Sequence, residues 1–242
     1  MPPLIVRIAL LLTCLVPCVQ AETIRVVTED TSFSYLRQGR VVGPATQLVE
    51  ATLERAGLND YRVGLYPWAR AYEMALREPN VLIYLIARTR EREDKFHWVG
   101  EILRIDYHLY RLPSREDIQI ERLEQAKQYR IGALRGDFRY QFLQEEGFTK
   151  LVVTVSNADS FKLLLNGQVD LVPMSEQGVR MFCAETGLAE GCLQRVLALN
   201  TATSLYMAYS LQTSEDVVLR SQAAFEYLQA DGTVERMMSG QR

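Results

Sequence analysis

Apolar and polar positions along the chain repeat with two different periods, as in a protein that alternates strands and helices. Residues 23–28 alternate between apolar and polar side chains, whereas residues 45–56 place apolar side chains at helical spacing. Residues 61–66 are strand-like again, and residues 67–76 follow as a helix with proline in its first turn. Residues 81–86 form a continuous apolar run, typical of a strand buried on both faces. This order predicts a doubly wound sheet.

A second series of the same kind follows a strand predicted over residues 104–112. Asn157 is a good N-cap for one of its helices, and Asp231-Gly232 breaks the closing helical region. Two separate series, each too small for a large core, predict two lobes rather than one α/β domain. The second series contains predicted strands at residues 130–134, 151–154, 169–172, 193–199 and 204–210, and predicted helices at residues 137–146, 157–165 and from about residue 175.

The first residues are typical of an export signal. Arg7 precedes an almost wholly apolar stretch over residues 8–16, and Val19-Gln20-Ala21 offers small residues at the spacing that a signal peptidase needs. The stretch is shorter than the roughly 20 apolar residues that span a bilayer. We therefore expect a signal peptide over residues 1–21, cleaved after Ala21, and a periplasmic location.

Four cysteines allow two further hypotheses. A lipoprotein anchor on Cys14 or Cys18 is the alternative to cleavage, although Thr13 and Pro17 stand where such an anchor needs a small residue. Cys183 and Cys192 are most simply a disulfide that closes a short loop in an exported protein. A zinc site is the alternative, but neither of the two histidines, His97 and His108, lies nearby in sequence. We expect no metal and no cofactor.

The charge balance disfavours one class of partner. The 27 Lys and Arg against 30 Asp and Glu give a net charge of −3, so there is no basic excess to favour nucleic acid. No polybasic helix suited to a membrane surface is present either.

Several segments of residues 22–242 carry a resemblance to a known family. One is Thr89-Arg90-Glu91-Arg92 with Phe96 four residues on; the others are residues 24–28 with Phe33, Tyr35 and residues 39–43, then residues 131–136, residues 165–170 and residues 230–233. In their order and spacing, these segments resemble the family 3 extracellular solute-binding proteins of the polar amino-acid binding type, which have a Thr-x-x-Arg motif followed by an aromatic residue.

This resemblance implies a two-lobed periplasmic binding protein-like (type II) α/β fold, with each lobe a doubly wound sheet flanked by helices. The chain would build lobe one from residues 22–110, lobe two from residues 111–204, and return to lobe one over residues 205–242. The implied function is substrate binding for an ABC-type transporter. The protein, expected to be a monomer, would close around a small polar ligand, an amino acid or other carboxylate, and then meet a membrane permease.

The resemblance also implies site residues in lobe one. Arg92 matches the arginine that grips the ligand carboxylate, and a guanidinium can make two parallel charge-assisted hydrogen bonds to such a group. Without the family pattern, the charged residues around position 92 would favour a surface arginine instead. Thr89 belongs to the same motif. Trp68 follows a predicted strand end, where open α/β sheets bind ligands, and would pack against the ligand; the alternative is a core tryptophan.

The remaining candidates are less specific. Arg70 faces either the cleft or solvent on its helix, and Phe33 and Tyr35 are either a wall of the site or core aromatics. In lobe two, Gly136 with Asp137 opens a helix whose N–H groups favour anions. The family has Ser or Thr at position 137, and an aspartate there would repel a carboxylate unless it serves only as the N-cap.

Position 175 departs from the family pattern as well. The family's ammonium-binding aspartate falls at Ser175 in this sequence, and the adjacent Glu176 would leave the chain at a different angle. The resemblance therefore supports a carboxylate on the ligand better than an amino group.

Two alternative functions remain open. A ligand sensor on the same fold would signal to a sensor kinase rather than deliver to a permease. A periplasmic dehydratase of cyclic carboxylates would need a general acid with a raised pKa, for which Glu176 is the one candidate in the sequence. No Gly-x-Ser-x-Gly, His-Glu-x-x-His or phosphate-loop motif is present, so we expect no enzymatic activity.

Overall fold

The computed structural model describes residues 23–239, apart from the side chains of residues 200–202. The predicted signal peptide lies outside the described residues. The strands are β1 (Ile24–Thr28), β2 (Tyr35–Arg37), β3 (Arg40–Val42), β4 (Tyr61–Leu65), β5 (Val81–Ala87), β6 (Phe96–Arg111), β7 (Ile131–Leu134), β8 (Leu151–Thr154), β9 (Val172–Ser175) and β10 (Gln194–Ser210). The helices are α1 (Pro44–Arg55), α2 (Trp68–Arg77), α3 (Leu123–Ala126), α4 (Phe138–Glu145), α5 (Asn157–Leu165), α6 (Glu176–Glu185), α7 (Glu215–Ala230) and α8 (Thr233–Ser239), with a short 3₁₀ turn at Glu93–Lys95.

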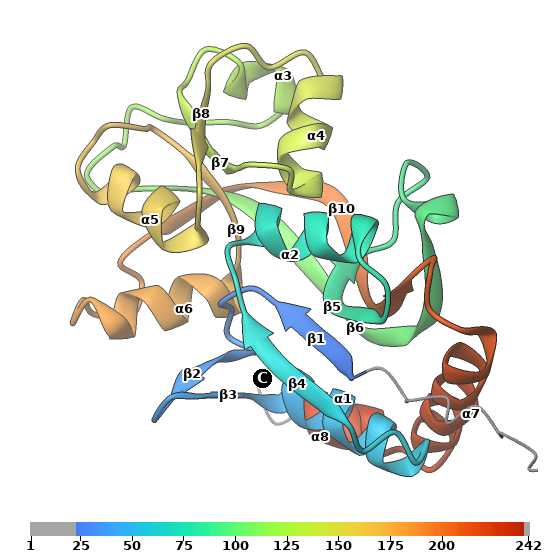
Figure 1. Ribbon diagram of the computed structural model, residues 1–242. Helices are drawn as coiled ribbons and strands as arrows, with labels where there is room; N and C mark the ends of the chain where they lie inside the picture. The colour runs from blue at the N-terminus through green and yellow to red at the C-terminus, as the bar shows by residue number, and fades with distance from the viewer. Residues whose placement is uncertain (1–22, 240–242) are drawn as a thin grey trace, which may run out of the picture.

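The main sheet has the strand order β4-β1-β5-β10-β6-β9. β1 runs parallel to both β4 and β5, as the predicted β-α-β-α-β series requires. A second, parallel pair is formed by β7 and β8, and a bridge from Ile131 to Leu171 connects this pair to the segment that leads into β9. We call the part with β1–β5, α1, α2, α7 and α8 the first lobe, and the part with β7–β9 and α3–α6 the second lobe (Figure 1).

The long strands β6 and β10 pass through both lobes. Near the C-terminus of β10, residues 204–210 lie between β5 and the first part of β6. The last part of β6 pairs with the first part of β10 on one side and with β9 on the other, from Tyr107 to Tyr110. Between these regions the register of β10 against β6 shifts, between Leu199 and Thr203. An irregular pairing at the passage between lobes is a suitable place for a hinge. The lobe boundaries proposed from the sequence remain predictions.

Each lobe buries its own apolar side chains. All seven residues of β5 are buried, because helices α1 and α7 pack on one side of the first-lobe sheet and α2 packs on the other. In the second lobe, Phe161, Val172 and Phe182 pack into a separate core together with Cys183. The predicted disulfide is confirmed: Cys183 and Cys192 are bonded and close the turn after α6.

Some predicted boundaries were wrong. The strand expected over residues 169–172 begins only at Val172, because Leu171 makes a single bridge before the chain turns to pair with β6. The strands expected over residues 193–199 and 204–210 are one strand, and β6 begins eight residues before residue 104. The N-cap of α5 is Ser156, whose side chain accepts from the Asp159 N–H, rather than Asn157.

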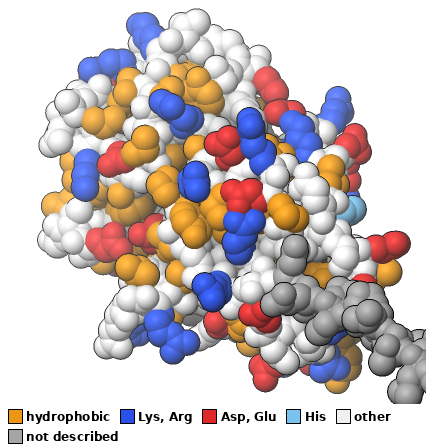
Figure 2. Space-filling view, viewed as in Figure 1, with side chains coloured by type: hydrophobic (Ala, Val, Ile, Leu, Met, Phe, Trp, Pro, Cys, Tyr) orange, Lys and Arg blue, Asp and Glu red, His pale blue; other side chains and the backbone are white. Residues whose placement is uncertain are grey.

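The surface carries both signs of charge. Acidic and basic side chains are interspersed over the face shown in Figure 2. Within residues 23–239, no helix has the length and apolar character needed to cross a membrane.

Candidate functional site

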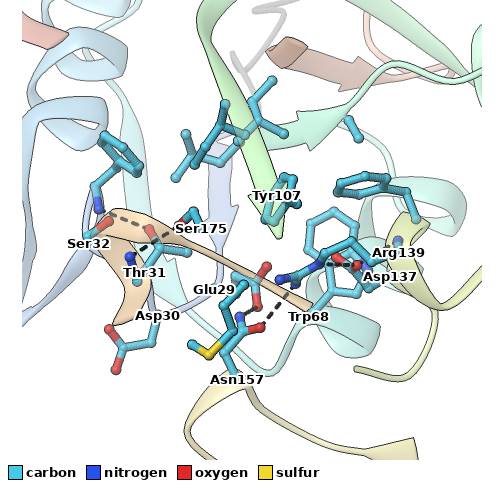
Figure 3. A pocket seen from close by; sticks show the side chains of 18 of the residues that line it. Glu29, Asp30, Thr31, Ser32, Trp68, Tyr107, Asp137, Arg139, Asn157 and Ser175 are labelled. Atoms are coloured by element: carbon cyan, nitrogen blue, oxygen red, sulfur yellow. Dashed lines mark hydrogen bonds and ion pairs between the residues drawn. The ribbon is translucent and has the colours of Figure 1, made fainter. Parts of the chain in front are cut away.

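A cavity of about 60 Å³ lies where the two lobes meet, at the carboxyl ends of β1 and β5 (Figure 3). This is the position where open α/β sheets bind ligands. The first lobe contributes Phe33, Trp68 and Arg92, and the second lobe contributes Asp137 and Ser175. The cavity is also lined by Glu29, Asp30, Thr31, Ser32, Leu85, Ala87, Ile105, Tyr107, Phe138, Arg139, Asn157, Met174, Gly178, Met181, Phe182 and Leu205.

Arg92 is fully buried, so the alternative of a surface arginine is wrong. Its Nη1 donates to the Ala87 carbonyl at 3.3 Å. Its Nη2 donates to two acceptors in the other lobe, the Gly136 carbonyl at 3.1 Å and Gln141 Oε1 at 3.5 Å. Its guanidinium carbon lies 4.9 Å from the Tyr72 ring centre and 5.4 Å from that of Trp68. The Nε–H has no hydrogen-bond partner, and no carboxylate within residues 23–239 forms an ion pair with this guanidinium.

Trp68 also joins the lobes. It is the first residue of α2 and is 3% exposed, and its indole Nε1 donates to the Gly136 carbonyl at 2.9 Å. Gly136 has φ of +69°, a conformation that residues with a Cβ rarely adopt. This turn directs the Gly136 carbonyl toward the first lobe, where it accepts hydrogen bonds from both Trp68 and Arg92.

A fixed network holds the second cation of the cavity, Arg139. Asp137 is the N-cap of α4, and its Oδ1 accepts from the Arg139 N–H at 2.8 Å and from Nε at 2.6 Å. The other guanidinium nitrogens donate to the Pro173 carbonyl and to Asn157 Oδ1, each at 3.0 Å. The N-cap interpretation of Asp137 is therefore confirmed, and its charge is balanced by Arg139.

Glu29 is the acidic residue that the sequence did not single out. It follows β1 directly, and its Oε2 accepts from Asn157 Nδ2 across the lobes at 3.2 Å. Burial and the nearby Asp137 raise the pKa of Glu29 to about 8, although Arg139 and Arg92 act against this rise. At neutral pH most Glu29 side chains therefore keep their proton.

Of the other residues predicted for the site, some lie at the cavity or beside a neighbouring groove, and the rest lie elsewhere. Phe33 and Ser175 line the cavity, and Ser175 Oγ also caps α6 by accepting from the Gly178 N–H at 3.1 Å. Thr89 lies beside a neighbouring groove, with a buried hydroxyl that has no hydrogen-bond partner. Their roles in binding stay predictions.

Arg70, Tyr35 and Glu176 do not line the cavity. Arg70 is exposed because α2 turns Trp68, Ala71, Met74 and Ala75 toward the core, which leaves position 70 on the opposite face. Tyr35 lies in β2 beside a separate groove at the surface. Glu176 is exposed and paired with Arg180 at 2.7 Å, one helical turn along α6.

No protein-family model and no curated protein matches this sequence. Solved structures do match its fold. A histidine kinase sensor domain with similarity to periplasmic binding proteins has a TM-score of 0.80 and 18% identity, covering 90% of this chain and 95% of that one. ArtJ of Geobacillus stearothermophilus, which binds arginine, lysine and histidine, has a TM-score of 0.78 and 15% identity, covering 90% of this chain and 94% of that one. The substrate-binding protein AbpA of Streptococcus pneumoniae, bound to L-arginine, has a TM-score of 0.76 and 17% identity, covering 90% of this chain and 93% of that one.

These similarities confirm the predicted two-lobed periplasmic binding protein fold. At such low identities the likeness establishes the architecture and leaves the ligand to be argued from the cavity itself.

Proposed function

We propose that this chain is a periplasmic solute-binding protein that closes its two lobes around a small molecule with a carboxylate and presents it to an ABC-type transporter. Arg92 is the observation that carries this proposal. Taking a cation out of water is costly unless an anion or a full set of acceptors compensates it. Arg92 has carbonyl, side-chain amide and aromatic neighbours, an unpaired Nε–H and no ion-paired acidic residue among the described residues. A ligand carboxylate would supply the missing charge.

The contacts between the lobes support closure as the binding motion. Trp68 and Arg92 both donate to Gly136, and Asn157 donates to Glu29, so each lobe contributes side chains that meet the other. Opening about the irregular β6–β10 pairing would break these bonds and admit a ligand. Closing around a ligand would then form them together with the ligand's own bonds.

A ligand sensor is the second candidate function. The similarity to a histidine kinase sensor domain, at a TM-score of 0.80, favours it, because the same closure can be detected by a sensor kinase instead of a permease. The dehydratase alternative is weakened, because Glu176, the acid named for that chemistry, lies outside the cavity.

A thermal-shift screen of amino acids and small organic acids tests the proposal. A ligand at one hundred times its dissociation constant stabilises the protein by about 2.7 kcal/mol, which raises Tm by about 5–10 °C for a chain of this size. Arg92→Met should weaken binding by at least about 30-fold, because truncating one partner of a buried charge pair costs 2 kcal/mol or more.

Arg70→Met is the matched control, since Arg70 is an exposed arginine outside the cavity. It should leave the ligand-induced shift unchanged. Without ligand, Arg92→Met should melt at the same or a higher temperature than wild type, because it removes a buried charge that lacks a counter-ion. A ligand shift that survives in Arg92→Met would contradict the proposal.

A further inference from the structure

We infer that the ligand is a small monocarboxylate with an apolar body and no ammonium group. This inference rests on the proposed function and names the class of molecule that the same cavity accepts. It follows from which charges in the cavity are already paired, from the apolar part of the cavity wall, and from the cavity volume.

The cavity offers one guanidinium for one carboxylate. Arg139 is held by Asp137, Asn157 and the Pro173 carbonyl, so its charge is already balanced within the second lobe. Arg92 has no acidic partner among the described residues. A second carboxylate on the ligand would therefore find no free cation in the cavity lining.

The same reasoning leaves no buried and unpaired carboxylate for a ligand ammonium. Asp137 is committed to Arg139 at 2.6 Å. Glu29 is bonded to Asn157, and its raised pKa keeps it largely uncharged at neutral pH. Asp30 also lines the cavity, but it is exposed to solvent, and Figure 3 shows its carboxylate directed away from Arg139 and Asn157. The cavity face of the α6 N-terminus carries the neutral hydroxyl of Ser175.

Part of the cavity wall is apolar instead. Leu85, Ala87, Ile105, Met174 and Leu205 line the cavity and are all buried. These side chains can cover a hydrocarbon group but offer an ammonium no hydrogen-bond acceptor.

Leu85 shows that this apolar wall is built by an unusual backbone. Its φ is +62°, which is a genuine outlier for a bulky residue. The pairing of β5 with β10 shifts at this point: Tyr206 faces Ile86 and Met207 faces Tyr84, so Leu85 is an extra residue in the strand. Such bulges redirect side chains near binding sites, and strained conformations cluster there as well.

The cavity volume sets the scale of the ligand. About 60 Å³ corresponds to the space of roughly four to six water molecules at 10–15 Å³ each. Short branched acids such as 3-methylbutanoate are of this scale.

Calorimetric titration with matched pairs tests the inference. Each acid is compared with its 2-amino counterpart: propanoate with alanine, 3-methylbutanoate with valine, 4-methylpentanoate with leucine, and 3-phenylpropanoate with phenylalanine. We expect at least one acid to bind, and its amino counterpart to bind at least about 30-fold more weakly, because the ammonium would be buried without a partner.

Ser175→Asp provides the complementary variant. Aspartate preserves the N-cap and adds a carboxylate to the cavity, so the preference should move at least about tenfold toward the amino acid. Ser175→Asn, which caps the helix without charge, should move the preference less than Ser175→Asp does.

The outcomes separate this inference from the proposed function. Amino-acid binding that equals or exceeds that of the matched acid, and is lost in Arg92→Met, would overturn the inference and leave the proposed function standing. Failure of every acid and amino acid to bind would overturn both.

Discussion

Replacing Glu29 with glutamine should flatten the pH dependence of stability between about pH 5 and pH 8. Burial and Asp137 raise the pKa of Glu29 from 4.5 to about 8 in the folded protein. In this window the folded state keeps a proton that the unfolded state has released. Stability is therefore fully retained below about pH 4.5, falls as the pH rises, and stops falling above about pH 8.

The size of the effect follows from the pKa difference. Within the window, each pH unit changes the free energy of unfolding by up to about 1.4 kcal/mol, so raising the pH from 6 to 7.5 should cost wild type about 2 kcal/mol through this one group. Urea denaturation at four pH values in this range measures the slope. The difference between wild type and Glu29→Gln isolates Glu29, because the other titrating groups are the same in both proteins.

A matched control is Glu176→Gln, which changes an exposed glutamate outside the cavity and should keep the wild-type slope. If wild type and Glu29→Gln gave equal slopes, Glu29 would not hold its proton in the folded protein, and the description of an uncharged side chain facing Asn157 would be wrong.

Two further predictions concern stability. Gly100→Ala should lower the free energy of unfolding by about 1–3 kcal/mol, because a Cβ there would lie 2.1 Å from the buried Phe225 ring; an unchanged urea midpoint would contradict this contact. Replacing both Cys183 and Cys192 with alanine should lower the free energy of unfolding by about 2.5 kcal/mol, because the disulfide closes a short loop between cysteines that are nine residues apart. The melting temperature should fall by several degrees, and equal melting curves would show that the disulfide does not stabilise the fold.

The regular elements of the fold were predictable because their periodicity is local. The seven buried residues of β5 form one apolar run, and α1 repeats its buried residues at helical spacing. The first part of β6 was missed because its burial does not alternate with period two. The β2–β3 hairpin was missed as well: its turn places Gln38 and Gly39 at positive φ, and glutamine gives little indication of that conformation.

The site was predictable only in part. Arg92 and Trp68 were found through a motif and through their position after strands. The partnership of Glu29 with Asn157 spans 128 residues and arises only when the lobes meet, so no sequence spacing reports it. The rule that ligands bind at the carboxyl ends of strands would have identified Glu29, which directly follows β1. The same rule could not show that Arg70 turns outward, since that depends on which face of α2 packs on the sheet.

A crystal structure of the complex with the tightest-binding acid from the screen tests the central claim most directly. We predict that both carboxylate oxygens lie within hydrogen-bonding distance of the Arg92 guanidinium, with the Nε–H among the donors, and that the ligand's hydrocarbon part contacts Leu85. A ligand whose carboxylate is bound elsewhere, with no contact to Arg92, would contradict the account.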